Sequence, residues 1–255
     1  MNQSLKSVIR PLLSRRISSH RVWDGPLRGA RIVTSWHDYP AGILGRTEKE
    51  LLRWFEANVR QGQTWLDIGA HYGYTAIALS RLVGPSGRVF AFEPMLTTAG
   101  YLSKTRNVNA LHQLTIIPMG LGAPEQSLTS IELPVERGMA DSTLKSGFHE
   151  SILVAGLDWL WPRIAGGNQR IDGVKIDVQG MEISVLRGMT ELLAREHPKL
   201  VVELHSGVDR SEFLEVLRAS GYCSPGRAVE IAAATAAESN GSRYFDNHSY
   251  AFVSE

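Results

Sequence analysis

Residues 64–73 read TWLDIGAHYG, and this stretch decides the fold class. Residues 64–68 form an apolar run that predicts a buried strand, and Gly69 stops it. The apolar positions that follow recur at helical spacing up to Val83. A buried strand that passes through a glycine turn directly into a helix is typical of folds in which strands and helices alternate.

The same alternation continues along the chain. Further apolar runs predict strands at 88–92, 115–117, 173–177, 200–204 and 250–253. We expect the last of these at an edge of the sheet. Between residues 120 and 172 the pattern is unclear, and only an extra hairpin arm over 127–135 is predicted.

Helix signals lie between the predicted strands. Thr47, with Glu50 three residues later, reads as a capping box for a helix that ends near Arg60. Apolar spacing predicts one helix over 183–193. Asp209 begins another helix, with Gly221 as its C-terminal cap.

Apolar strands joined by helices of about a dozen residues need crossovers, which build a mostly parallel sheet covered on both faces. The sequence therefore predicts an α/β fold with a doubly wound, Rossmann-like sheet, in a single domain with N-terminal and internal additions on the acceptor side. The 255 residues suit one large domain, which we expect to span 46–255 behind a basic N-terminal arm or lid at 1–45. Ligands of such sheets bind beyond the carboxyl ends of the strands.

Charge and cysteine content exclude several kinds of partner. The chain has 27 Lys and Arg against 26 Asp and Glu, so its formal net charge is +1 and no overall field favours a nucleic acid. The single Cys223 cannot form an internal disulfide, which favours the cytoplasm as the location.

The chain has no predicted membrane span, since no stretch reaches the roughly 18 to 20 apolar residues that such a span needs. Basic residues are scattered through 6–21 around Pro11, so we expect a solvated arm there.

The predicted strand ends carry acidic side chains. Asp67 stands just before the glycine turn, where a negative charge suits a ligand with an ammonium or sulfonium group and suits a pyrophosphate poorly. A nicotinamide dinucleotide site would need a third glycine, and Tyr72 interrupts that spacing. Glu93 ends the next strand, where a carboxylate can accept hydrogen bonds from the 2′ and 3′ hydroxyls of a ribose.

Three segments together resemble a known family. The glycine turn at 65–73, the segment FAFEP at 90–94, and VKIDVQGME at 174–182 with its continuation to Gly188 are similar to the FkbM-type methyltransferases that depend on S-adenosylmethionine, within the class I methyltransferase superfamily. The resemblance runs from about residue 45 to 222. The chain departs from it at His71, where Asn is usual, and at Gln179, where Glu is common.

The resemblance implies S-adenosylmethionine as cofactor and assigns residues to it. Asp67, Gly69, Ala70 and Gly73 would surround its methionine part, and Glu93 its ribose. Gly120, at the end of the third strand, would lie near the adenine. No acid adjoins Gly120 to bind the adenine amine, and Asp141 is a candidate for that contact.

The last two parallel strands carry the candidates for catalysis. Lys175 and Asp177 lie on one face of a strand, where a buried lysine needs an acidic partner. Glu182 is expected to stabilise the start of the next helix. Glu203 and His205 also share a face, and His205 is the first candidate for a general base, with Asp177 and Glu203 as alternatives. These three residues would alternatively hold a divalent ion such as Mg²⁺; no metal site is otherwise predicted.

The predicted function is transfer of a methyl group to a hydroxyl of a small molecule or glycan. The alternative is a sensor or scaffold that binds S-adenosylmethionine without catalysis. We expect no nucleic acid partner. The identity of the acceptor and the oligomeric state are left open by the sequence.

Overall fold

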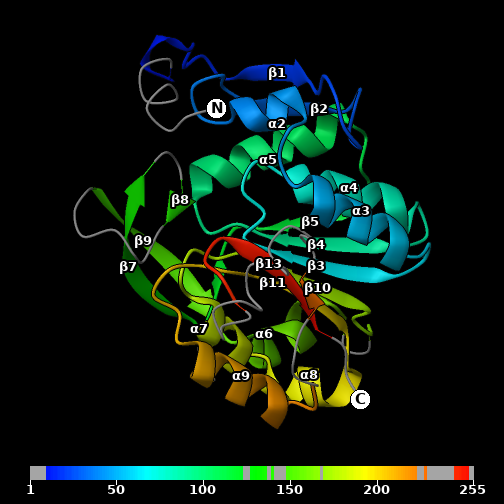
Figure 1. Ribbon diagram of the computed structural model, residues 1–255, viewed down its shortest axis with the longest axis vertical. Helices are drawn as coiled ribbons and strands as arrows, with labels where there is room; N and C mark the ends of the chain where they lie inside the picture. The colour runs from blue at the N-terminus through cyan, green and yellow to red at the C-terminus, as the bar shows by residue number, and fades with distance from the viewer. Residues whose placement is uncertain are drawn as a thin grey trace.

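The computed structural model describes residues 10–122, 127–136, 139–140, 148–166, 169–222, 227–228 and 244–252. In these ranges the chain forms a central sheet, a smaller sheet and an N-terminal hairpin. Figure 1 shows the central sheet between two layers of helices, with the hairpin above and the smaller sheet to one side. No helix within the described ranges is long and apolar enough to cross a membrane.

The central sheet has seven strands in the described part of the chain. Their order is β12 (Arg227–Ala228), β13 (His248–Phe252), β11 (Lys199–Leu204), β10 (Gly173–Ile176), β3 (Thr64–Ile68), β4 (Arg88–Phe92) and β5 (Leu114–Ile117). The five strands from β11 to β5 are parallel, which confirms the predicted doubly wound α/β fold. The prediction of an edge strand at 250–253 is wrong, because β13 pairs antiparallel with β11 on one side and β12 on the other.

Helices cover both faces of this sheet, which explains why all five residues of β3 are buried. The helices α3 (Lys49–Asn58), α4 (Tyr74–Val83) and α5 (Leu96–Val108) lie above it in Figure 1. The other face packs on α6 (Leu157–Ile164), α7 (Glu182–Arg187), α8 (Thr190–Glu196) and α9 (Arg210–Ala219).

Two helix predictions need correction and two are confirmed, the first of them by α4, which ends at Val83 as predicted. Helix α3 begins after Glu48, which has a left-handed φ of 53°, so Thr47 lies outside the first turn and its hydroxyl donates to the Glu48 carboxylate instead. The helix predicted over 183–193 is broken at Gly188, where a Cβ atom would lie 1.8 Å from the carbonyl oxygen of Gly122. Asp209 caps α9 as predicted, because its carboxylate accepts from two backbone amides.

The region with an unclear sequence pattern forms the smaller sheet. Its strands are β6 (Gly120–Leu121), β9 (Phe148–Ala155), β7 (Thr129–Glu136) and β8 (Met139–Ala140). The predicted hairpin arm is confirmed in outline, since β7 pairs antiparallel with β9. Ile152 and Val154 of β9 are buried and pack against Met95, which joins this sheet to the start of α5.

The N-terminal segment is packed on the domain from residue 22 onward, whereas residues 11–21 contain no buried residue, so the solvated arm expected over 6–21 stays a prediction. The short 3-10 helix η1 (Arg10–Leu12) is followed by a hairpin of β1 (Ser18–Arg21) and β2 (Arg31–Thr34), and then by α2 (Pro40–Leu44). Val22, Ile32 and Ile43 are fully buried. The amide of Val33 donates to the Thr105 hydroxyl of α5 at 3.0 Å, so the hairpin lies directly on that helix. A lid function for this segment stays a prediction.

Candidate active site

A cleft of about 320 Å³ opens at the carboxyl ends of the parallel strands, as expected for this kind of sheet. Six of the predicted site residues line it: Gly69, Ala70, Glu93, Gly120, Asp177 and Glu203. Asp67, Gly73 and His205 are not part of its lining. Asp141 lies outside the described residues.

The glycine turn brings backbone to the floor of the cleft. Gly69 has a φ of +79°, and a Cβ atom there would lie 1.8 Å from the carbonyl oxygen of Asp177. The amides of Gly69 and Ala70 both donate to the carbonyl of Phe92. A side chain at position 69 has no room, so the turn presents main chain to a ligand.

A buried ion pair fixes the strands behind this turn. Asp67 is fully buried, and Lys175, opposite to it in the sheet register, is 4% exposed. The Lys175 ammonium lies 3.2 Å from Asp67, 3.5 Å from Asp177 and 3.0 Å from the carbonyl oxygen of Gly69. Burial opposes the charge of Lys175, but the two carboxylates outweigh it and raise its pKa. The predicted ion pair is confirmed, with Asp67 as an additional partner.

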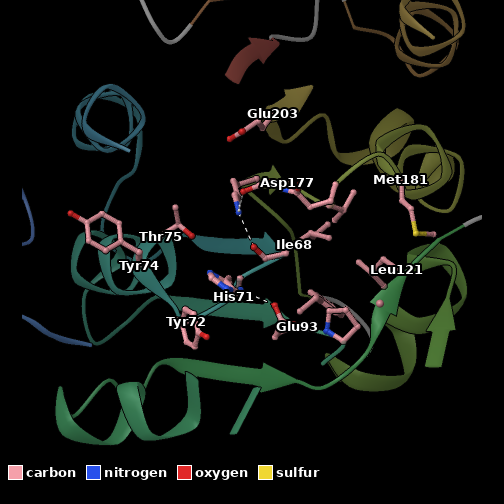
Figure 2. A pocket seen from close by; sticks show the side chains of 18 of the residues that line it. Ile68, His71, Tyr72, Tyr74, Thr75, Glu93, Leu121, Asp177, Met181 and Glu203 are labelled. Atoms are coloured by element: carbon pink, nitrogen blue, oxygen red, sulfur yellow. Dashed lines mark hydrogen bonds and ion pairs between the residues drawn. The ribbon is translucent and has the colours of Figure 1, made fainter. Parts of the chain in front are cut away.

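Glu93 lies in the middle of the cleft, as Figure 2 shows. It is 5% exposed, and its two carboxylate oxygens accept from the amides of His71 at 2.8 Å and Met95 at 3.0 Å. Burial raises the pKa of Glu93 to about 7, although both amides act against this shift. Each oxygen keeps a further lone pair, so the carboxylate can accept hydroxyl groups of a ligand.

One end of the cleft is apolar. Its lining there comes from the smaller sheet, the loop after β5 and the loop before α7, through Met119, Leu121, Leu133, Ile152, Val154 and Met181. Figure 2 shows Leu121 and Met181 together at this end. Gly120 is the residue near this end that the sequence predicts. The others are not predicted, because β7 and β9 lie in the region where the sequence pattern is unclear.

The opposite end is acidic and aromatic. Asp177 and Glu203 face it from β10 and β11, and Glu48 joins them from the start of α3. The ring of Tyr39 lies edge-on to His71 at 5.4 Å and to Tyr74 at 6.2 Å. Tyr39 belongs to the N-terminal segment that the sequence assigns to the acceptor side, whereas the contribution of Glu48 is missed, since it carries no spacing signal for a site.

His205 lies behind the two carboxylates of β10 and β11. Its Nδ1 atom donates to Glu182, which is fully buried, at 2.6 Å. Its Nε2 atom lies 3.5 Å from Asp177 and 3.6 Å from Glu203. Burial lowers the pKa of His205, but the hydrogen bond to Glu182 and the surrounding carboxylates outweigh burial and raise it. Glu182 therefore does more than begin its helix, because it orients the histidine.

Glu203 is the carboxylate whose ionisation the site changes most. The charge of Asp177, together with burial and the charge of Glu48, raises the pKa of Glu203. The Glu203 carboxyl group can therefore hold or release a proton close to neutral pH.

A metal ion is the alternative use of this cluster. Ligand atoms of Asp177, Glu203 and His205 all lie within 4.8 Å of one another. The ammonium group of Lys175 already lies beside Asp177 and competes with a cation for it. A bound Mg²⁺ stays a prediction.

The cleft combines the features that an adenosyl-sulfonium ligand needs. An apolar end suits the adenine, the buried Glu93 suits the ribose hydroxyls, and the glycine turn beside Asp177 suits a charged methionine end. This site, on a parallel sheet with an antiparallel strand inserted beside β11, defines a class I methyltransferase that depends on S-adenosylmethionine.

Comparison with known proteins agrees with this class. The family model described as the methyltransferase FkbM domain matches residues 67–223, and the chain belongs to this family. The hexuronic acid methyltransferase AglP of Haloferax volcanii is 28% identical to it over 174 residues, which make up 68% of each chain. The family resemblance seen in the sequence is thereby confirmed, and the protein is an enzyme that transfers methyl groups.

Two solved structures are similar to this chain at low sequence identity. Methyltransferase FkbM from Methylobacillus flagellatus KT has a TM-score of 0.49 and 16% identity, and the match covers 79% of this chain and 50% of that one. Fibrillarin from Aeropyrum pernix, determined with natively bound S-adenosylmethionine, has a TM-score of 0.46 and 14% identity over 94% of this chain and 88% of its own.

Proposed function

We propose that the enzyme methylates a hydroxyl group of a sugar, in a glycan or a glycosylated small molecule, in the cytoplasm. The observation that carries the proposal is the acidic and aromatic end of the cleft. Carboxylates there lie beside tyrosine rings, which can pack against the C–H face of a sugar. The similarity to a protein named for a hexuronic acid supports a sugar-like acceptor. Methyl transfer to a panel of free glycosides, followed by mass spectrometry, tests it.

The cofactor is assigned to the other part of the cleft. Glu93 would accept both ribose hydroxyls, Gly120 and its apolar neighbours would enclose the adenine, and the turn from Gly69 to Gly73 would hold the methionine end. When bound, S-adenosylmethionine supplies a methyl group that its sulfonium already activates. Asp67 lies behind the cleft wall, where it holds Lys175 and accepts from the Thr75 hydroxyl at 2.7 Å. A direct contact of Asp67 with the cofactor stays a prediction.

The residues at the acceptor end have the task of aligning the hydroxyl and removing its proton. Glu203 lines the cleft and would accept this proton, since its neighbours favour the protonated form. Asp177 would orient the hydroxyl, and His205 would hold both carboxylates from behind. Tyr74 offers a further contact, because its buried hydroxyl has no hydrogen-bond partner among the described residues.

Replacement of the proposed base gives a direct test. We expect Glu203→Gln to lower kcat by about 10² to 10⁴, because an amide keeps the shape of the side chain but cannot accept the proton. The dissociation constant of S-adenosylhomocysteine, measured by calorimetry, should stay unchanged. Glu215→Gln, at an exposed position of α9, is the matched control and should leave kcat as it is. Equal kcat values for both variants would remove Glu203 from the mechanism.

Cofactor binding should depend on pH through Glu93. The pKa of about 7 means that this group is protonated in the free enzyme at lower pH, whereas the ribose hydroxyls need the carboxylate as acceptor. We expect the dissociation constant of S-adenosylhomocysteine to rise about tenfold for each pH unit below 7 and to level off above 8. Glu93→Gln should bind more weakly at pH 8 and show no such slope. If the dissociation constant of Glu93→Gln depended on pH as steeply as that of the wild type, the titrating group would be one other than Glu93.

The charge of the cleft predicts which sugars are accepted. Its described lining has five carboxylates, of Asp38, Glu48, Glu93, Asp177 and Glu203, and a single lysine that is already ion-paired. We expect kcat/KM for a neutral hexoside to exceed that for the matching hexuronic acid by about 10- to 100-fold, because like charges repel. The uronamide is the control of equal size, and it should behave like the neutral sugar. A preference for the uronic acid would contradict this charge argument.

A further inference from the structure

Basic charge is concentrated at the N-terminal end of the chain. The first 31 residues contain seven of the 27 basic side chains and one of the 26 acidic ones, although the whole chain has a net charge of only +1. Their described part, from residue 10 onward, includes η1 and the hairpin at the top of Figure 1. Basic residues are therefore in excess in the N-terminal segment, and acidic residues are in excess in the rest of the chain. Residues 10–31, the described part of this segment, are called the basic cap below.

The arginines of this cap are free to meet a partner. Arg15, Arg16, Arg21, Arg28 and Arg31 are all exposed. None of the five forms an ion pair within the described part of the chain. The one acid of the segment, Asp24, lies 3.9 Å from Lys49 of α3. Nothing acidic in the described chain neutralises the cap.

The hairpin holds two of these arginines directly opposite each other. Arg21 and Arg31 are paired in the register of β1 and β2, so their side chains leave the same face. Arg31 Nε donates to the Ser19 hydroxyl at 2.9 Å, which fixes its guanidinium there. Like charges directly opposite each other destabilise an antiparallel pair. An anion that lies against this face would attract both guanidinium groups and so compensate for the repulsion between them.

The same segment also exposes large apolar side chains. Leu12 of η1 is 82% exposed, and Trp23, two residues after β1, is 60% exposed. The Trp23 indole is held edge-on against Trp36, with ring centres 5.4 Å apart. Arginines interleaved with an exposed tryptophan and leucine are typical of surfaces that rest at the boundary between lipid headgroups and acyl chains.

We propose that the cap formed by residues 10–31 docks on the anionic surface of a lipid bilayer. The arginines would contact lipid phosphates, and Leu12 and Trp23 would enter the headgroup region. Phosphates of RNA would satisfy the arginines equally well, but they would leave Leu12 without an apolar partner. The acceptor end of the cleft is lined in part by residues that follow the cap in the chain, namely Asp38, Tyr39, Thr47 and Glu48. Docking would therefore bring that end close to acceptors at the membrane, whatever their chemical identity.

Vesicle binding of the full chain tests the proposal. We expect the protein to sediment with vesicles of phosphatidylcholine that contain about a third phosphatidylglycerol, and not with phosphatidylcholine alone. Arg21→Gln combined with Arg31→Gln should lower the partition coefficient about 25-fold, since each arginine near an anionic surface contributes about fivefold. Arg15→Gln with Arg16→Gln, outside the hairpin, should have a similar effect. Arg88→Gln with Arg218→Gln removes the same charge from exposed positions elsewhere and should bind like wild type.

Further readouts separate docking from misfolding and from nucleic acid binding. The melting temperature of the Arg21→Gln, Arg31→Gln variant should not fall, because a like-charge pair has been removed. Trp23 fluorescence should shift to shorter wavelength on anionic vesicles, and Trp23→Phe should lose this shift whereas Trp36→Phe keeps it. Sedimentation that is absent at 50 mM salt, or equal for the cap variants and the Arg88, Arg218 control, would overturn the proposal. Binding of a random RNA under conditions where vesicles are not bound would overturn it as well.

Discussion

Lys175→Met is expected to lower the free energy of unfolding by about 3 to 5 kcal/mol, because removal of one partner leaves buried charge without compensation. Asp67 is fully buried and has Lys175 as its ion-pair partner in the described chain. A methionine side chain fills a similar space but cannot neutralise the charge of Asp67. For a chain of this size the loss corresponds to a fall in melting temperature of roughly 10 °C, which calorimetry or circular dichroism can measure.

Two further variants identify the cause of this loss. Adding Asp67→Asn to Lys175→Met should restore part of the stability, because the unpaired buried charge is then gone. Lys49→Met removes the exposed pair with Asp24 and should change stability by less than about 1 kcal/mol. If Lys175→Met melted like Lys49→Met, the buried ion pair would not be a major contributor to the fold.

Gly69→Ala is expected to damage both stability and activity. The left-handed φ of +79° costs an alanine about 1 to 2 kcal/mol. Its Cβ atom would also overlap the Asp177 carbonyl oxygen, and overpacking of this kind costs about 1 to 3 kcal/mol more. The strand end that carries Asp177 must move, and a displacement of about 1 Å in a site can lower the rate about 10²-fold.

Gly207→Ala is the matched control for this substitution. Gly207 has a φ of +86°, but no atom lies within 4 Å of the position that a Cβ would take. It should therefore show the conformational cost alone, with kcat unchanged. The difference in unfolding free energy and in kcat between the two alanine variants measures the close approach at Gly69. Identical losses would show that the contact with Asp177 is tolerated.

The sequence predicts the parallel part of the sheet well, because its strands are covered on both faces and read as continuous apolar runs. The strands at 64–68 and 88–92 begin and end where they are predicted. Glu93 and the glycine turn could be placed for the same reason, since each follows directly from a strand end. The predicted pairing of Lys175 also rests on a local rule, namely that charge in a central strand needs a partner.

The features that the sequence does not predict depend on contacts between distant segments. The break at Gly188 is set by Gly122, and the place of His205 behind the cleft is set by Glu182 on another element. A place on the acceptor side is expected for the segment that holds Tyr39, but the packing of its hairpin on α5 is not, because no periodicity within residues 10–45 indicates that contact. Local patterns describe elements, whereas these positions follow from how the elements are assembled.

The position of Glu48 in the chain, ahead of the family segment, has a consequence for how this enzyme can diversify. Glu48 and its neighbours from position 38 precede the segment 67–223 that defines the family. Part of the wall proposed to meet the acceptor thus precedes the family segment, whereas Asp177 and Glu203 at the same end of the cleft lie inside it. We expect exchange of residues 38–48 between relatives to alter the preference for the acceptor and to leave the affinity for the methyl donor unchanged.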